Sequence, residues 1–191
     1  MEVIVKSLIG IFTIIDGKIS LLMYNNGIPT IMCSDNIEKE NKKYIDTNLN
    51  IDDLELKQCY TFSEKDDNKL FITVLYMDIV NSNSIKSNKY DLVPIENIET
   101  NDYVYKLLDC LKKELVLNST IKKIYPGEFV LPEIQKIYED LLNKKYDRRN
   151  FRKKLIKLDV IEDINKMSES KKGRPAKLYR FKDITEDKIL F

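Results

Sequence analysis

The sequence predicts an α+β protein built from two domains. Segments rich in β-branched and apolar residues fill most of the N-terminal part, whereas the last third alternates between helical and strand-like patterns. The charge changes at the same place, because residues 1–120 hold 13 basic and 19 acidic side chains and residues 121–182 hold 18 basic and 9 acidic ones. We therefore expect domains at 1–118 and 119–182, followed by a C-terminal tail at 183–191.

Strand and turn signals define the N-terminal elements. Strands are expected at 3–15, 19–24, 60–62 and 70–80, helices at 36–47 and 102–117, and loops at 63–69 and 81–88. Asp16-Gly17 is a hairpin turn signal, and Asp35 or Asn36 can cap the polar helix that follows. Residues 92–94 are expected to lead into a short turn.

The C-terminal segment predicts a helix, a turn, a second helix and a β-hairpin. The first helix has an apolar stripe at i, i+3, i+4, i+7 and i+8, formed by Ile134, Ile137, Tyr138, Leu141 and Leu142. A second helix is expected at 148–158, where Asp147 can cap its first turn. Strands at 160–164 and 176–181 enclose a polar loop at 165–174. This order is typical of a winged helix-turn-helix, which binds double-stranded DNA.

The second helix presents a basic face. If Phe151, Leu155 and Leu158 form its buried side, a turn of about 100° per residue points the basic side chains of the same helix outward. Arginine can make bidentate bonds to guanine, and an isoleucine can touch a thymine methyl group. The helix candidates for DNA contact are Arg148, Arg149, Asn150, Arg152, Lys153, Ile156 and Lys157. The ordinary alternative is a charged face that only meets water.

A second basic cluster lies in the expected wing. Lys171, Lys172, Arg174 and Lys177 surround Gly173 and Pro175, an arrangement that suits a phosphate track or a minor groove. Its position directly after the basic helix favours DNA binding over a merely solvated face.

Composition excludes several other functions. The chain has no histidine, so Ser-His-Asp and Cys-His catalysis are excluded. Cys33, Cys59 and Cys110 have no paired spacing, which argues against a disulfide framework or a zinc site and for three small buried hydrophobes. No apolar run approaches the roughly 20 residues of a membrane span, and no signal-peptide pattern is present. We expect a cytoplasmic protein with no membrane partner, no metal and no cofactor.

The C-terminal sequence also resembles a known family. The run "LPEIQKIYEDLLNKKYDRRNFRKKLIKL" followed by "GRPAKLYRF" is similar to the winged helix of Nudix-related transcriptional regulators of the NrtR type, and "QCYTFSE" resembles the strand after the Nudix helix. The resemblance implies a homodimeric regulator, expected to be a repressor, on a palindromic operator. It also implies an N-terminal Nudix-like α/β/α sandwich with a mixed sheet. That domain would sense a metabolite such as ADP-ribose, another sugar nucleotide or a sugar phosphate.

The Nudix-like domain lacks the residues of a hydrolase. Such enzymes need a glycine-rich loop and a helix with the pattern Arg-Glu-x-x-Glu-Glu, whose glutamates bind magnesium. Aligning Ile45 and Ile51 with the motif's apolar positions places Tyr44, Thr47 and Asn48 where the glutamates should be. We therefore predict a degenerate domain without catalytic residues or enzyme activity.

Other positions of the motif also differ from those of an active hydrolase. Asn50 replaces a motif glycine, and Glu38 and Glu40 lie one turn early.

Two alternative functions stay open. A divergent nucleotide pyrophosphohydrolase with a nucleic-acid-binding domain is the main alternative, and a general RNA-binding protein is the third hypothesis. Aromatic residues that could stack on an effector include Tyr24, Tyr60 and Phe62, although such residues more often belong to a core or an interface.

Overall fold

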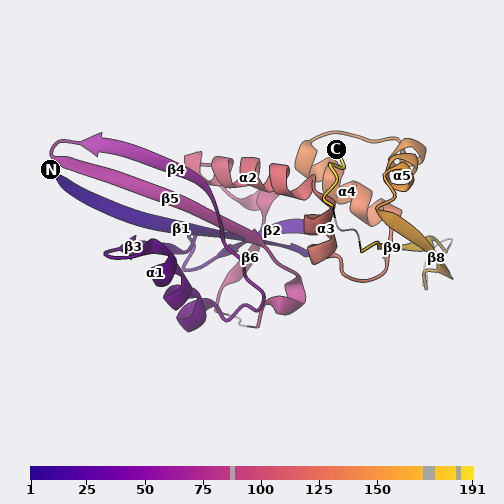
Figure 1. The fold of residues 1–191 in the computed structure, drawn as a ribbon, viewed down its shortest axis with the longest axis horizontal. Helices are drawn as coiled ribbons and strands as arrows, with labels where there is room; N and C mark the ends of the chain where they lie inside the picture. The colour runs from indigo at the N-terminus through magenta and orange to yellow at the C-terminus, as the bar shows by residue number, and fades with distance from the viewer. Residues whose placement is uncertain (87–88, 170–174, 184–185) are drawn as a thin grey trace. The chain divides into compact units, whose positions relative to one another are not determined.

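The computed structural model describes residues 1–86, 89–169, 175–183 and 186–191 of the chain (Figure 1). They form two compact units, Met1–Leu111 and Lys112–Phe191. The division falls inside α2 (Asp102–Leu115), ahead of the boundary at residue 118 that the sequence suggested. The polar residues at that predicted boundary begin a helix, α3 (Asn118–Ile124). Within the described ranges, no helix is long and apolar enough to cross a membrane.

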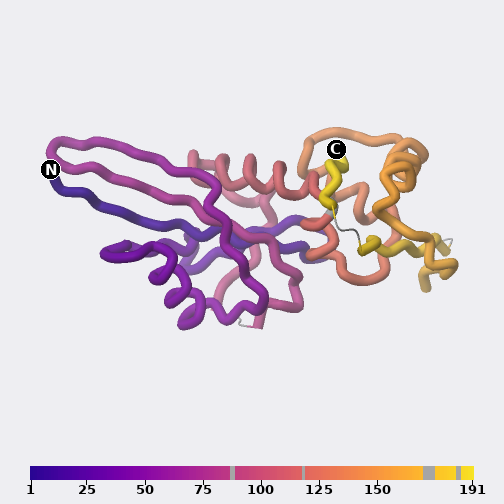
Figure 2. Tube along the Cα trace, viewed as in Figure 1, coloured from indigo at the N-terminus to yellow at the C-terminus, as the bar shows by residue number. Residues whose placement is uncertain are grey.

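The first unit is built on one mixed sheet. Its strands are β1 (Glu2–Ile15), β2 (Lys18–Met23), β3 (Thr30–Cys33), β4 (Lys57–Asp66), β5 (Lys69–Ile79) and β6 (Asp91–Pro94). The order is β4-β5-β1-β2-β6, with β3 also paired to β1. Strands β1 and β5 are parallel, and the other pairs are antiparallel. Figure 2 shows the β4–β5 hairpin running beside β1 toward the N-terminus.

Helices cover both faces of this sheet, as the Nudix resemblance implied. Successive side chains of β1 point to opposite faces. Ile9 and Ile11 are fully buried in a cluster with Leu49, which lies in the π-helical segment Ile45–Leu49 that continues α1 (Ile37–Tyr44). Gly10 faces α2 on the other side, where an added Cβ would lie 2.8 Å from Leu107 Cδ2. Figure 1 shows α1 and α2 on opposite sides of the strands.

Several details of the first unit differ from the sequence expectations. The segment expected as a loop at 63–69 is mostly strand, and β4 and β5 are separated by only two residues. Because β4 is an edge strand, its charged side chains can meet water without leaving the sheet. β3 was not expected, and residues 92–94 form β6 instead of a lead into a turn. Asn36 caps α1, since its side chain accepts a hydrogen bond from the Lys39 amide at 2.9 Å.

Two cysteines that are distant in sequence come together in this unit. The Cys110 thiol on α2 donates to the Cys59 carbonyl oxygen on β4, with a sulfur–oxygen distance of 3.6 Å. Burial, and then the neighbouring Cys110, raises the pKa of Cys59 to about 12. All three cysteines are free thiols. Spacing along the chain could not reveal this contact, because it depends on how α2 packs on the sheet.

The second unit follows the predicted helix-turn-helix and hairpin order. Its elements are α3, β7 (Phe129–Val130), α4 (Leu131–Leu142), α5 (Arg148–Lys157), β8 (Ile161–Met167) and β9 (Lys177–Phe181). The sheet order is β7-β9-β8, with both pairs antiparallel. β8 extends three residues beyond the predicted end at 164.

The chain end belongs to the core of this unit and is not a separate tail at 183–191. Leu190 is fully buried, and its amide donates to the Val116 carbonyl oxygen at 2.7 Å. The Phe191 ring stacks on Phe151 with centroids 5.1 Å apart and contacts Tyr138 at 4.5 Å. The last residues therefore close the apolar core against which α4 and α5 pack.

Candidate nucleic-acid interface

Helix α5 is held with one side in the core. Asp147 caps it by accepting a hydrogen bond from the Asn150 amide at 2.9 Å. Phe151 and Leu155 are buried, and Leu158 is half-buried. The predicted inner side of the helix is therefore confirmed, and the opposite side must face outward.

The structure places all of the predicted helix contacts on the surface. Every side chain from Arg148 to Lys157 that was expected to meet DNA is exposed, including Ile156 at 46%. In the part of the chain that is described, no carboxylate forms an ion pair with Arg149, Lys153 or Lys157. Helix α5 itself contains no acidic residue. Its outer face is thus a concentrated positive charge with an exposed apolar side chain among the cations.

Basic residues on the neighbouring hairpin are arranged differently. Lys177 donates to Asp163 Oδ2 at 2.7 Å, and this contact raises the pKa of Lys177. The Arg180 Nε donates to Glu162 at 2.9 Å, and Lys182 pairs with Asp159 at 2.6 Å. These three hairpin cations are therefore each paired with a carboxylate, whereas Arg149, Lys153 and Lys157 of α5 are not. Lys177, expected to contact DNA, is exposed but already paired.

Arg152 connects the basic helix to the hairpin. Its Nε donates to the hydroxyl of the buried Tyr179 on β9 at 3.0 Å. This bond fixes the side chain at the edge of α5 that faces the wing. The remaining wing candidates, Lys171, Lys172 and Arg174, lie outside the described residues.

Sequence reasoning passed over one cation on α5. The Lys154 ammonium lies 4.6 Å from the centroid of the Phe191 ring, a cation–π distance. It therefore covers the chain end and does not join the outward set. No sequence pattern links residue 154 to residue 191.

The positions that replace the catalytic glutamates of a hydrolase lie together in the first unit. Tyr44, Thr47 and Asn48 line one pocket of about 340 Å³, together with Glu40 and Lys43. The side-chain amide of Asn48 donates to the Tyr44 carbonyl oxygen at 3.0 Å. The sequence alignment thus selected three residues that line one pocket, where a phenol, a hydroxyl and an amide take the place of the carboxylates.

Glu40 has a structural role at the start of α1. Its carboxylate accepts hydrogen bonds from the Ser34 amide at 3.1 Å and the Asp35 amide at 2.9 Å. These bonds, that from Ser34 first, hold the pKa of Glu40 below its ordinary value. Within the described ranges, no three Cys, Asp or Glu side chains are grouped so that they could hold a metal ion. The donor set does not fit the magnesium site that the Nudix resemblance implies.

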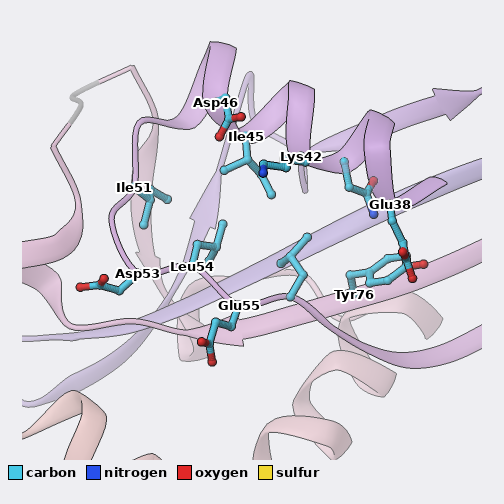
Figure 3. A pocket seen from close by; sticks show the side chains of 11 residues that line it. Glu38, Lys42, Ile45, Asp46, Ile51, Asp53, Leu54, Glu55 and Tyr76 are labelled. Carbon is cyan, nitrogen blue, oxygen red and sulfur yellow. The ribbon is translucent and has the colours of Figure 1, made fainter. Parts of the chain in front are cut away.

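A larger pocket of about 640 Å³ lies on the other side of α1 (Figure 3). Ile45 and Lys42 extend from the helix, Ile51 and Leu54 rise opposite them, and Glu38 and Tyr76 lie side by side at one end. Asn41 also lines this pocket and is 3% exposed. Neither its Oδ1 nor its Nδ2 has a hydrogen-bond partner within the described structure. An unpaired buried polar group of this kind lowers the free energy of unfolding by about 1–3 kcal/mol.

The three aromatic effector candidates do not form one site. Tyr60 and Phe62 are in edge contact with centroids 4.8 Å apart, and Phe62 also contacts Tyr103 of α2. Tyr24 packs instead against the core cluster that contains Ile9, on the α1 face. None of the three lines the pocket of Figure 3. Sequence reasoning missed Asn41 because α1 is polar on most sides, so its buried side was not evident.

Comparisons with known proteins agree with this architecture. Residues 123–181 match the NrtR DNA-binding winged helix domain. The ADPR responsive transcriptional repressor NtrR of Acinetobacter baylyi is 29% identical over 122 residues, which are 58% of this chain and 48% of that protein. The chain thus matches about half the length of this curated relative.

Two solved structures have the same fold. Shewanella oneidensis NrtR complexed with a 27mer DNA superposes with a TM-score of 0.69 at 17% identity, covering 93% of each chain. A MutT/nudix family protein from Enterococcus faecalis gives 0.61 at 12% identity, covering 95% of this chain and 87% of that one. The resemblance to Nudix-related regulators of the NrtR type is therefore confirmed, as is the predicted fold of a Nudix-like sandwich followed by a winged helix.

Proposed function

We propose that this protein is a DNA-binding transcriptional repressor whose operator affinity changes when the Nudix-like unit binds a metabolite. The observation that carries the proposal is the outer face of α5, where Arg149, Lys153 and Lys157 lie exposed without carboxylate partners among the described residues. A helix of this kind fits the major groove of DNA, where phosphates and base edges supply the missing partners. The exposed Ile156 offers the apolar contact that a thymine methyl group needs.

The relatives support the same function. The Acinetobacter baylyi protein is named as an ADPR responsive repressor, and the Shewanella oneidensis protein was crystallised with DNA. By analogy, the effector is ADP-ribose, another sugar nucleotide or a sugar phosphate. A homodimer then places two α5 helices on a palindromic operator, with half-sites about one helical turn apart. The effector favours a dimer arrangement in which the two helices no longer match successive half-sites.

Selection of bound duplexes from a random DNA pool tests this proposal. We expect an enriched sequence with two inverted half-sites. Enrichment of no duplex sequence, or preferential recovery of single-stranded RNA, would contradict it. Fluorescence anisotropy with the selected duplex then measures whether ADP-ribose changes affinity.

We further propose that the Nudix-like unit does not hydrolyse nucleotides. Tyr44, Thr47 and Asn48 cannot supply the carboxylates that hold magnesium, and Glu40 is engaged at the start of α1. Incubation with ADP-ribose and with dinucleoside polyphosphates, with added magnesium or manganese, should release no phosphate-containing product above the no-protein control. Turnover that tracks the purified protein would support the alternative of a divergent pyrophosphohydrolase.

A further inference from the structure

The pocket of Figure 3 is separate from the site that the Nudix resemblance implies. Successive residues of a helix turn by about 100°. Glu38, Asn41, Lys42 and Ile45 therefore point to one side of α1, whereas Glu40, Tyr44 and Thr47 point to the opposite side. A ligand of the larger pocket would occupy a different place from a nucleotide at the degenerate catalytic positions.

Asn41 indicates which chemistry this pocket can bind. Its amide offers one acceptor and two donor hydrogens side by side, and none of them is paired within the described residues. A complementary ligand carries a hydrogen-bond donor directly beside an acceptor. The amino group and adjacent ring nitrogen of adenine have this geometry, and asparagine pairs with them in two hydrogen bonds. The amide atoms are shielded from solvent, so pairing with a ligand in the pocket requires the Asn41 side chain to rotate.

The charges around the pocket disfavour an anionic group such as phosphate. Four carboxylates line it, those of Glu38, Asp46, Asp53 and Glu55, against the single ammonium of Lys42. Their combined potential repels an anion and favours a neutral or cationic ligand. Tyr76, which is 8% exposed, adds a hydroxyl whose pKa is raised by burial and by the charge of Glu38, so it remains a donor.

Apolar side chains supply the rest of the lining. Ile45, Ile51, Leu54 and Leu56 surround the space, and in Figure 3 Leu54 rises toward Ile45 from the opposite wall. A flat aromatic ring can lie between such walls, and sites for small molecules typically enclose about 300–1,000 Å³. The pocket's volume of about 640 Å³ falls within this range.

We propose that this pocket binds an aminated purine base that carries no phosphate, such as adenine or adenosine, through the amide of Asn41. This site goes beyond the proposed function, because it is distinct from the place where a sugar nucleotide would act. It gives the Nudix-like unit a second ligand site that discriminates against nucleotides.

Calorimetry and thermal shift on the full chain test the proposal. Adenosine should bind and raise Tm with concentration, because a ligand that binds only the folded state stabilises it. Purine riboside, which lacks the amino group, should bind at least tenfold more weakly, since it can form only one of the two hydrogen bonds. AMP should bind more weakly than adenosine. Absence of adenosine binding, or tighter binding of AMP, would overturn the proposal.

Two variants locate the binding. Asn41→Leu removes donor and acceptor and keeps the branched shape of the side chain, so adenosine binding should fall roughly tenfold or more. Its Tm without ligand should equal or exceed that of the parent chain, because an unpaired buried amide is removed. Asp53→Asn/Glu55→Gln removes two of the four lining carboxylates, so the ratio of AMP affinity to adenosine affinity should rise. Unchanged adenosine binding in Asn41→Leu would place the site elsewhere and refute the assignment.

These outcomes do not depend on whether the winged helix binds DNA. Loss of adenosine binding with normal DNA binding contradicts only the pocket. Loss of DNA binding with normal adenosine binding contradicts only the proposed regulator.

Discussion

Helices α1 and α5 begin in the same way but use their charges differently. Each is capped by a side-chain oxygen, Asn36 in α1 and Asp147 in α5, at 2.9 Å from the amide three residues later. In α1, the carboxylate of Glu40 turns back to bind the amides just before the helix. In α5, Arg149 and Lys153 have no carboxylate partner among the described residues.

This difference shows that charge composition alone does not identify a binding surface. Polar helices are common, and most of their charges meet water or each other. The informative feature of α5 is that its unpaired cations are concentrated on a helix with no acidic residue, whereas the lysines of α1 stand among Glu38 and Glu40. By this criterion α5 is the candidate binding surface, whereas the carboxylate at the start of α1 has a structural role.

The largest effect on stability should follow from a substitution on the buried side of α5. Phe151→Ala removes the ring that packs against Phe191, Tyr138 and Tyr146. We expect it to destabilise the second unit by about 3–5 kcal/mol, as for other buried phenylalanines. Arg149→Ala, on the exposed side, should change stability by less than about 0.5 kcal/mol. Urea unfolding measures both, and equal losses would contradict the assignment of the two sides.

Thiol reactivity should report on the packing of the first unit. All cysteines lie in the first unit, and the pKa of Cys59 is raised to about 12. At pH 8 its alkylation should be roughly tenfold to a hundredfold slower than that of an unfolded peptide thiol, because the scarcer thiolate is only partly offset by its greater nucleophilicity. Peptide mass spectrometry after timed iodoacetamide treatment measures the rate. Rapid modification in the folded chain would show that the Cys59 thiol of β4 is not shielded by packing against α2.

The wing should contribute a smaller and non-specific share of DNA affinity. Lys171→Ala/Lys172→Ala should weaken binding to all duplexes alike. The slope of log K against log salt should become less steep by about 0.9 for each phosphate that the variant no longer neutralises. Anisotropy titrations at several salt concentrations provide the slope. If it stays unchanged while affinity for one sequence falls, these lysines do not contact phosphates.

The smallest effect concerns the turn between α4 and α5. Glu139 accepts hydrogen bonds from Gln135, from the Tyr146 amide and from Lys145, and these bonds lower its pKa to about 2. A carboxylate with a lowered pKa adds stability above its ordinary pKa of 4.5, and this stability disappears as the pH falls toward 2. Glu139→Gln should therefore flatten the pH dependence of Tm between pH 4.5 and 2. An identical pH profile in the variant would show that Glu139 is not engaged.

The sequence predicted the elements that local patterns specify. The apolar stripe of α4 and the cap of α5 are encoded within a few residues, so their positions were confirmed. Strands β3 and β6 are short and depend on pairing with β1 and β2, which no local signal reports. The packing of Phe191 on Phe151, the Cys59–Cys110 contact and the burial of Asn41 likewise require knowledge of the tertiary fold.

The central claim is that uncompensated charge on α5, and not basic charge in general, binds DNA. Two double variants with equal loss of charge test it by fluorescence anisotropy on the selected duplex. Arg149→Ala/Lys153→Ala should lower affinity by about a hundredfold, since each base or phosphate contact contributes about 1–3 kcal/mol. Arg180→Ala/Lys182→Ala, whose cations are paired with Glu162 and Asp159, should lower it less than about threefold. Similar losses in both variants would contradict the claim.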